Sequence, residues 1–443
     1  MGTPYGLHRG NDSAIPQIPT RNTILHAIQS PSGNRSISDR FIQVRAQSEA
    51  LCARLEPEDL VVQSMPDASP AKWHLAHTTW FFERMVLKEF LPHYDSFHPR
   101  YDYLFNSYYL TVGMMHPRPT RGLLSRPTVR EVLAYRRRID EQVLQLLIAP
   151  QAAASTIETL VTLGLAHEEQ HQELLLTDLK HAFSCNPLEP RYTSESDRPA
   201  PAALPHVERV HVDGGLYEIG HDGIGFAFDN EGPRHSIHLN PFAIATRPVS
   251  CGEYLAFIAD GGYRRPELWL SDGWAILERS SDKLPLYWRH DADNYDVFTL
   301  HGRRAVVAAE PVCHLSYYEA DAFARWAGAR LPTEAEWEVA ATIAAPRETP
   351  QGAHPDVLQP TGDMQQVLGG VWEWTQSAYG PYPGFRPLPG ALGEYNGKFM
   401  CSQVVLRGGS CATPRGHIRL TYRNFFPPSA RWQFSGLRLA YDR

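Results

Sequence analysis

The chain has 443 residues, a length that accommodates two or three domains. Hydrophobic residues make up 43% of it and charged residues 21%, which argues against global disorder. The formal net charge of −7 argues against binding nucleic acid through bulk positive charge. No apolar run approaches the ~20 residues that cross a bilayer, and the N-terminus lacks the apolar core of a signal peptide. We therefore expect a cytoplasmic protein without a nucleic-acid or membrane partner; its oligomeric state stays open.

The six cysteines are scattered along the chain and form no CxxC pair. This spacing argues against a disulfide scaffold and against a cysteine zinc site. The cysteines are Cys52, Cys185, Cys251, Cys313, Cys401 and Cys411.

The first part of the chain has the pattern of a helical bundle. Residues 1–36 are rich in Pro, Ser, Asn, Thr and Gly without an apolar period, so we expect a mobile N-terminal arm. A helix is then expected from Ser38 to about Leu55. Ser69 followed by Pro70 is a start signal for a second helix.

Three further apolar stretches complete this region. Residues 101–115 are interpreted as helical, although their pattern is ambiguous. Thr128 opens a helix whose apolar residues recur at helical spacing, and a last helix covers roughly residues 155–183. Together these elements predict a four-helix bundle over residues 37–185.

A change of composition marks a second domain. Residues 186–205 are dense in Pro, Ser and charge, which is typical of a linker. Residues 206–443 contain short strand-like runs among Gly, Pro and aromatic residues, so we expect an irregular α+β domain. Three capping boxes announce its helices: Ser250 with Glu253, Ser316 with Glu319, and Thr333 with Glu336.

The strongest chemical signal is HEEQHQE, residues 167–173. At ~100° per residue, His167 and His171 lie on one face of the last bundle helix. That face also carries Gln170, Asp178 and three leucines, Leu160, Leu163 and Leu174. The leucines should point into the core, where buried polar groups without partners are costly. A metal ion would satisfy both histidines.

A catalytic metal needs a third ligand from another helix. His77 is the natural candidate because it lies within an apolar helix, and His74, one turn earlier, competes with it. Three neutral ligands would leave open positions on iron, zinc, nickel or copper. The alternative also stays open that His167 and His171 are surface residues or hydrogen-bonded core residues.

Several motifs resemble known families. SPAKWHLAHTTWFFE followed by HEEQHQELLL resembles the DinB-like bundle of iron-dependent sulfoxide synthases. The second half resembles the formylglycine-generating-enzyme/sulfatase-modifying-factor fold, through PVSCGEYLAFIADGGY, ARLPTEAEWEVAA, GGVWEWTQSAYGPYPGF, VLRGGS and FSGLRLA. In this order the motifs resemble the ergothioneine-biosynthesis sulfoxide synthase family over about residues 38–443.

The resemblance implies a multidomain α and α+β protein. Its DinB-like bundle would precede an irregular C-type-lectin-like/formylglycine-generating-enzyme-like domain. The cofactor would be nonheme Fe(II), and the substrates O2, a thiol and hercynine (Nα-trimethylhistidine). The enzyme would join cysteine or γ-glutamylcysteine to C2 of the hercynine imidazole and leave the sulfur as a sulfoxide. Bringing thiolate and O2 to one metal overcomes the spin and proximity barriers to this reaction.

The resemblance also assigns site residues. The three family iron ligands match His77, His167 and His171, which favours His77 over His74. Gln170 matches a family glutamine that contacts the hercynine imidazole.

Asn424 matches an asparagine expected at the other end of hercynine. The best-known members follow it with an aromatic and an acidic residue, whereas Phe425 and Phe426 follow it here. This departure removes a charge partner of the trimethylammonium group, although an aromatic face could still contribute ~0.5–2 kcal/mol by cation–π attraction. Both phenylalanines could equally belong to the core.

The chemistry also needs a proton donor. The adjacent Tyr108 and Tyr109 in the bundle are preferred, and only one should face the metal because neighbours on a helix diverge by ~100°. Tyr379 and Tyr382 are alternatives in the second domain. All four could instead be ordinary packed aromatics.

The thiol substrate carries a carboxylate, which arginine binds in bidentate fashion. Arg118, Arg121 and Arg126 cluster in one loop of the bundle, although exposed loop arginines are common. We expect cysteine as the donor because no motif for a second carboxylate is visible, and γ-glutamylcysteine stays open.

Four other functions compete with this interpretation. Formylglycine generation needs a paired-cysteine copper site, and no cysteine completes a pair with Cys411 in TPRGHIRLTYR. An ovothiol-type 5-histidylcysteine sulfoxide synthase usually carries a C-terminal methyltransferase domain, which is not expected here. A DinB-class metal-dependent thiol transferase and a lectin-like binding module are the remaining alternatives.

Overall fold

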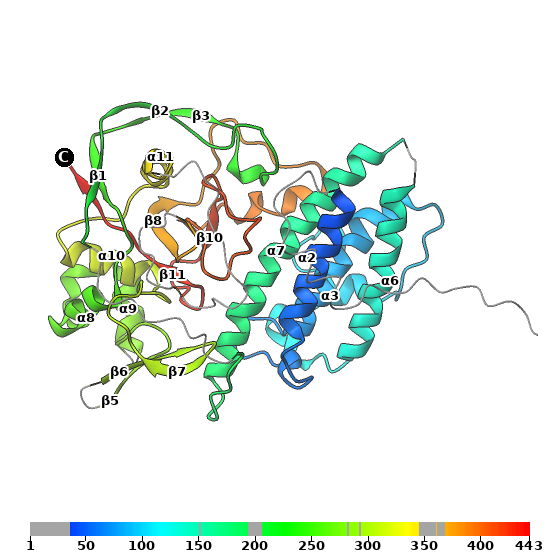
Figure 1. Cartoon of the computed structure of the whole chain (residues 1–443), viewed down its shortest axis with the longest axis horizontal. Helices are drawn as coiled ribbons and strands as arrows, with labels where there is room; N and C mark the ends of the chain where they lie inside the picture. The colour runs from blue at the N-terminus through cyan, green and yellow to red at the C-terminus, as the bar shows by residue number, and fades with distance from the viewer. Residues whose placement is uncertain are drawn as a thin grey trace, which may run out of the picture.

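A computed structural model describes residues 36–149, 152–193, 206–280, 283–291, 294–344, 360 and 368–443. The predicted N-terminal arm, apart from Ser36, lies outside these residues, as does most of the predicted linker. In Figure 1 a bundle of long helices lies beside a second body of short strands and helices. This is the predicted order of an α region followed by an α+β region.

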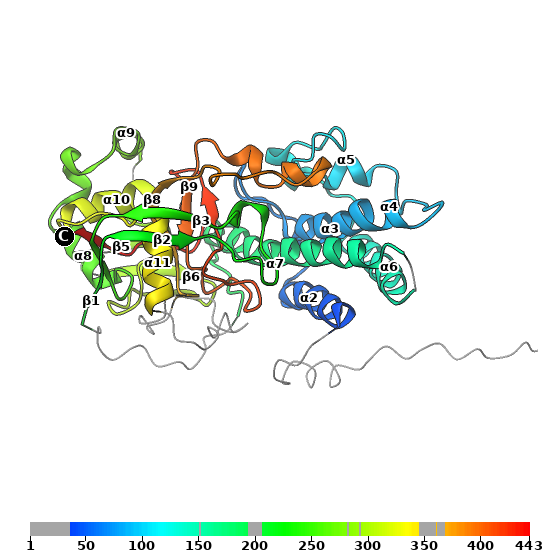
Figure 2. The same cartoon turned by 90° about the horizontal axis from the view of Figure 1, so that it is seen from above.

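The bundle consists of four long helices, of which α7 is the longest. Thr128 and Glu131 form the predicted capping box at the start of α6, and α3 begins directly after Pro70. The first helix starts two residues earlier than predicted, because Ser36 rather than Ser38 accepts the capping hydrogen bond from the Asp39 N–H. Figure 2 shows α3 alongside α7. The helices are α2 (Ile37–Cys52), α3 (Ala71–Phe82), α6 (Val129–Ile148) and α7 (Ala154–Ser184).

The prediction of a helix over residues 101–115 is wrong beyond its first turn. Helix α5 covers only Tyr101–Phe105, and the chain leaves the helix at Asn106. The Asn106 side chain accepts a hydrogen bond from the Tyr109 N–H (3.2 Å) and donates one to the Tyr109 carbonyl (3.0 Å). Asparagine competes in this way with the helical hydrogen-bond pattern. Tyr108 and Tyr109 therefore lie on an irregular loop, and the argument from their helical separation does not hold.

The second body contains small sheets rather than one large one. Antiparallel pairing joins β1 (Arg209–Val212) to β4 (Phe242–Ala245) and β4 to β12 (Ala440–Asp442). A second group runs in the order β10 (Asn424–Phe426), β9 (Val404–Arg407), β8 (Trp372–Ala378) and β11 (Ser435–Gly436). Strands β2 (Gly215–Ile219) and β3 (His235–Leu239) form an antiparallel pair. A three-stranded antiparallel sheet contains β5 (Trp288–Asp291), β6 (Asn294–Thr299) and β7 (Gly302–Ala305).

The helices of this body begin where the capping boxes place them. Ser250 and Glu253 cap α8 (Cys251–Ala259), and Ser316 and Glu319 cap α10 (Tyr317–Trp326). Thr333 and Glu336 exchange hydrogen bonds of 3.1 and 2.7 Å at the start of α11 (Glu334–Ala344). A further helix, α9, spans Ser271–Arg279. All three predicted boxes are confirmed.

Buried polar contacts join the two bodies along α7. The Glu173 carboxylate accepts hydrogen bonds from the Trp372 indole (2.8 Å) and the Thr413 hydroxyl (2.7 Å). Further along the helix, the Lys180 ammonium lies 2.7 Å from His314 Nε2. The predicted boundaries 37–185 and 206–443 stay predictions, but these contacts show one continuous packed structure. Within the described part of the chain, no helix combines the length and apolar character of a membrane span.

Candidate metal centre and substrate site

Helices α3 and α7 bring three histidines to one point. His167 and His171, one turn apart on α7, meet His77 of α3, and one ring nitrogen from each lies within 4.8 Å of the others. The Nε2 atoms of His77 and His167 are 3.2 Å apart, and all three rings are buried. Among the described residues, no other group of three or more His, Cys, Asp or Glu has the spacing of a metal site.

The environment keeps these imidazoles neutral. Burial, followed by the neighbouring imidazoles, lowers the pKa of His77 and His171 well below the usual value. Burial also lowers the pKa of His167 to about 3. His77 Nδ1 donates to the Phe105 carbonyl (2.6 Å), which leaves Nε2 with a lone pair facing the cluster. Three neutral nitrogen donors in a buried pocket fit a divalent transition metal.

His74, the competing third ligand, supports the cluster without joining it. Its Nδ1 lies 2.8 Å from Nδ1 of His171, and its Nε2 lies 3.1 Å from the Asp178 carboxylate. Asp178 also accepts a hydrogen bond from the Ser69 N–H (2.8 Å). A ligand histidine is typically oriented through its second ring nitrogen in this way. The structure thus gathers His77 with His167 and His171, and places His74 behind His171.

The Gln170 side chain reaches from α7, the helix that carries His167 and His171, to the second body. Its Nε2 donates to the Tyr422 hydroxyl (2.5 Å), and its Oε1 accepts from the Tyr395 hydroxyl. The Tyr395 ring lies 5.5 Å from the His167 ring, centroid to centroid. Neither tyrosine is predicted from the sequence, because both lie on irregular segments. The closeness of Tyr422 to Asn424 was the one available signal.

Tyr108 and Tyr109 lie at the edge of the same site. The Tyr109 side chain is buried beside Tyr108, with ring centroids 4.9 Å apart, and its ring lies 5.7 Å from Trp80, which stacks on His77. The Tyr108 ring lies 6.0 Å from Tyr395. Burial raises the pKa of both tyrosines above the usual value, so both phenols keep their protons at neutral pH.

The hydroxyls of the two alternative tyrosines are hydrogen-bonded to groups of the second body. The Tyr379 hydroxyl accepts a hydrogen bond from Asn230 (2.9 Å), and the Tyr382 hydroxyl donates to Glu334 (3.3 Å). Tyr382 packs in the smaller hydrophobic core around α11 rather than beside the histidines.

The segment after Asn424 has two different faces. The Asn424 side chain accepts from the Phe425 N–H (2.9 Å). Phe425 stacks on Tyr379 at 4.0 Å, and its ring is 5.9 Å from Phe399, which in turn packs against Tyr108. Phe426 instead packs edge-on against Trp432 at 5.9 Å. Alternation along β10 therefore turns Phe425 toward the aromatic surroundings of the site and Phe426 away from them.

Of the three arginines in the loop of the bundle, one is buried. Arg121 donates to the Ser69 and Ser107 hydroxyls (2.9 and 3.0 Å) and lies 3.4 Å above the Trp73 ring. Burial, followed by the charge of Arg118, lowers the pKa of Arg121 to about 9. In the described structure no carboxylate pairs with this guanidinium. Arg118 instead donates to a backbone carbonyl, and Arg126 is exposed.

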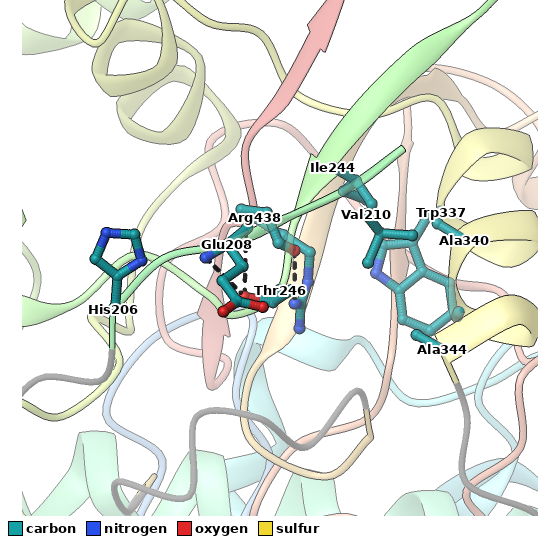
Figure 3. Close-up of a pocket in the computed structure, with 11 residues that line it drawn as sticks. His206, Glu208, Val210, Ile244, Thr246, Trp337, Ala340, Ala344 and Arg438 are labelled. Atoms are coloured by element: carbon teal, nitrogen blue, oxygen red, sulfur yellow. Dashed lines mark hydrogen bonds between the residues drawn. The ribbon is translucent and has the colours of Figure 1, made fainter. Parts of the chain in front are cut away.

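A cavity of about 400 Å³ lies elsewhere, between β1, β4 and α11 (Figure 3). Its walls include Val210, Ile244 and Trp337, and none of the predicted site residues lines it. Arg438 in its wall already forms a double salt bridge with Glu373 (2.7 and 2.8 Å). This cavity is therefore separate from the candidate metal centre.

Comparison with known proteins agrees with this two-part structure. Residues 40–175 match the DinB superfamily, and residues 195–356 and 347–443 match the sulfatase-modifying factor enzyme 1-like domain. A hercynine oxygenase of Mycolicibacterium smegmatis is 32% identical in an alignment of 447 positions, gaps included. This alignment covers 92% of this chain and 99% of that protein. The chain belongs to the hercynine oxygenase family. A hercynine oxygenase of Mycobacterium tuberculosis is also 32% identical, over 90% of this chain and 97% of its own length.

Two further relatives match parts of the chain. A formylglycine-generating enzyme of Streptomyces coelicolor is 32% identical over 48% of this chain and 82% of its own length. Ergothioneine biosynthesis protein 1 of Schizosaccharomyces pombe is 28% identical over 48% of this chain and 27% of its own length. These findings confirm the predicted family and fold class of this hercynine oxygenase relative.

All six cysteines are free; Cys401 is exposed and Cys411 is buried.

Proposed function

We propose that this member of the hercynine oxygenase family is an Fe(II)- and O2-dependent sulfoxide synthase. It joins the sulfur of cysteine or γ-glutamylcysteine to C2 of the hercynine imidazole and yields the cysteine conjugate as a sulfoxide. The observation that carries the proposal is the buried cluster of three neutral histidines, with Gln170 on the same helix between two of them. The name of the full-length relatives supports hercynine as the substrate and oxygenation as the reaction type.

His77, His167 and His171 would hold the iron. Three neutral nitrogen ligands leave open positions, and Fe(II) bound there would supply a common centre for the thiolate and O2. The contact of His74 with His171, backed by Asp178, fixes the orientation of one ligand before any metal binds.

Gln170 would orient the hercynine imidazole, since its Oε1 is the acceptor that an imidazole N–H requires. Tyr395 now donates to that atom. A bound imidazole would compete for it and leave the Tyr395 hydroxyl beside His167 as a proton donor. The buried Tyr109 and the adjacent Tyr108 are the donors that the sequence predicts.

Arg121 would bind the carboxylate of the thiol substrate. It is a buried guanidinium that stacks on Trp73, and Trp73 in turn stacks on His77 at 4.5 Å. A buried charge without a counter-ion is costly, and a substrate carboxylate would repay that cost through bidentate hydrogen bonds.

One assay tests the proposal and identifies the sulfur donor. The protein is loaded with Fe(II) without oxygen and given hercynine with either cysteine or γ-glutamylcysteine; air is then admitted and the products are weighed by mass spectrometry. We expect a conjugate one oxygen heavier than the thioether, and none from the His171→Ala variant. If wild-type protein with confirmed iron forms no conjugate with either thiol, the proposal fails. Histidine in place of hercynine tests the ovothiol-type reaction.

A further inference from the structure

One carboxylate near the candidate site has no counter-charge. Asp229 opens a short turn, Asp229–Glu231, and its Oδ1 accepts a hydrogen bond from the Asn396 side chain (2.7 Å). Its Oδ2 is shielded from solvent and has no hydrogen-bond partner in the described structure. The Asn396 amide is neutral, so the charge of this carboxylate is left unbalanced.

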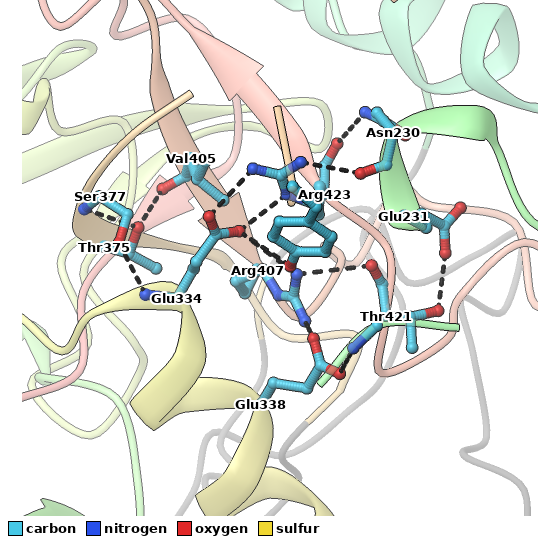
Figure 4. A network of polar contacts seen from close by, with 12 residues as sticks. Asn230, Glu231, Glu334, Glu338, Thr375, Ser377, Val405, Arg407, Thr421 and Arg423 are labelled. Atoms are coloured by element: carbon cyan, nitrogen blue, oxygen red, sulfur yellow. Dashed lines mark hydrogen bonds and ion pairs between the residues drawn. The ribbon is translucent and has the colours of Figure 1, made fainter. Parts of the chain in front are cut away.

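Three other carboxylates of the second body are each paired with an arginine, and two of these pairs, Glu334 with Arg423 and Glu338 with Arg407, are drawn in Figure 4. The pairs are Glu231 with Arg419 (2.8 Å), Glu334 with Arg423 (2.8 and 2.9 Å), and Glu338 with Arg407. These arginines are therefore already neutralised. Among the described residues, no lysine or arginine lies within salt-bridge distance of Asp229, so the region carries one uncompensated negative charge there.

The turn that carries Asp229 is held firmly on its C-terminal side. The Asn230 carbonyl accepts from Arg423 (2.8 Å), and the Asn230 side chain donates to the Tyr379 hydroxyl (2.9 Å). The Glu231 carboxylate accepts from the Thr421 hydroxyl (2.7 Å) and from the Phe228 N–H (2.8 Å). Burying an unpaired carboxylate oxygen is costly, and a fixed turn cannot relieve that cost by moving. A cationic ligand would relieve it.

Aromatic residues flank the turn that carries this carboxylate. Phe228, the preceding residue, packs against Tyr395 at 5.5 Å, and Tyr379 stacks on Phe425. Burial is the main cause that raises the pKa of Tyr379 and Tyr395, and the charge of Asp229 adds to the rise in both. A carboxylate among aromatic faces is the environment that recognises a quaternary ammonium group, whose methyl groups need no hydrogen-bond acceptor.

Two consecutive residues, Tyr395 and Asn396, connect this carboxylate to α7 through their hydrogen bonds. Asn396 contacts Asp229, and Tyr395 contacts Gln170 between the candidate metal ligands. A substrate whose imidazole lies at Gln170 would extend its other end toward Asp229 and Phe425.

We propose that Asp229 supplies the counter-charge for the trimethylammonium group of the substrate and so selects hercynine. The inference rests on the proposed function. It also explains how the chain dispenses with an acidic residue after Asn424, where Phe425 and Phe426 stand: the charge comes from a turn about 200 residues earlier in the sequence.

The test measures binding rather than turnover. Hercynine is titrated without oxygen into the Fe(II)-loaded wild type and Asp229→Asn variant by calorimetry, together with a neutral analogue that carries a tert-butyl group in place of trimethylammonium. Asparagine keeps the acceptor for Asn396 and removes only the charge. We expect hercynine to bind roughly 30-fold more weakly to the variant, the size of a desolvated cation interaction of about 2 kcal/mol, and the analogue to bind equally to both. Asp222→Asn, which removes an exposed carboxylate that precedes Asp229 in the sequence, should change neither affinity.

Two outcomes separate this inference from the proposed function. If wild-type protein binds hercynine and forms the conjugate, but Asp229→Asn binds hercynine unchanged, Asp229 is not the counter-charge and the proposed function stands. If wild-type protein does not bind hercynine, the proposed function itself fails. Should Asp229→Asn not fold, Asp229→Glu retains the charge and must retain the preference for hercynine over the neutral analogue; loss of that preference refutes the inference.

Discussion

Replacing Glu173 should weaken the attachment of the second body to the metal helix. Glu173 follows His171 by two residues on α7 and faces away from the histidine cluster. Its carboxylate accepts hydrogen bonds from the Trp372 indole (2.8 Å), the Thr413 hydroxyl (2.7 Å) and the Ser410 hydroxyl. All of these groups are buried, so water cannot replace a lost acceptor.

The size of the effect depends on what replaces the carboxylate. In Glu173→Ala up to three buried donors lose their acceptor, which should cost about 3 kcal/mol or more of the free energy of unfolding. Glu173→Gln keeps one oxygen for the indole, and the two hydroxyls can rotate to accept from its amide. Burial raises the pKa of Glu173 despite the hydrogen bonds, so the charge of this carboxylate contributes less to stability than its role as an acceptor. The glutamine variant should therefore lie within about 1 kcal/mol of the wild type.

Urea unfolding followed by circular dichroism at pH 7 measures both variants. Glu158→Ala, an exposed position on the same helix, is the matched control and should be neutral. If Glu173→Ala unfolds within 1 kcal/mol of the wild type, the three hydrogen bonds do not hold the bodies together and the reasoning is refuted. If Glu173→Ala and Glu173→Gln lose the same free energy of unfolding, the negative charge of Glu173 stabilises this contact rather than its hydrogen-bond acceptor.

Three further predictions concern the site and its support. Tyr109→Phe should shift the products from the conjugate toward oxidised thiol, as measured by mass spectrometry; an unchanged ratio in both Tyr109→Phe and Tyr108→Phe would exclude these donors. Arg121→Met should raise the KM for the thiol roughly tenfold or more and leave the KM for hercynine unchanged, and an unchanged thiol KM would exclude Arg121 as its carboxylate ligand. Burial lowers the pKa of Lys180 from 10.5 to about 8, so the folded state binds fewer protons between these values and the free energy of unfolding should rise with pH there. Lys180→Met should lack that rise, of about 2 kcal/mol, in unfolding curves at pH 8 and 10; equal rises in both proteins would contradict it.

Local sequence signals predicted the elements whose physics is local. The capping box of Thr128 and Glu131 depends on residues three apart, and the helical spacing of His167 and His171 depends on residues four apart. The helix expected over residues 101–115 failed because a single side chain, that of Asn106, binds backbone groups that a helix needs.

Other features of the site depend on contacts that no local pattern records. Tyr395 meets Gln170 across 225 positions, and Trp372 meets Glu173 across 199. Asp229 lies in a polar turn, and nothing in its sequence neighbourhood distinguishes it from an ordinary surface aspartate. Only the three-dimensional structure shows that its Oδ1 contacts a neutral amide and that its Oδ2 is buried without a partner among the described residues.

The rotation of α7 about its axis is set by three different partners. Glu168 turns toward Arg45 and Arg136, whose charges outweigh the effect of burial and lower its pKa to about 2. His167 and His171 turn toward α3, and Gln170 and Glu173 turn toward the second body. A slip of one residue turns the helix by ~100° and would bring a buried carboxylate into the histidine cluster and separate two arginines from their counter-ion. Because each of these changes is costly, the buried charges around α7 keep the candidate metal ligands facing α3. Contacts with the second body also fix this rotation, so that body helps to form the site as well as covering it.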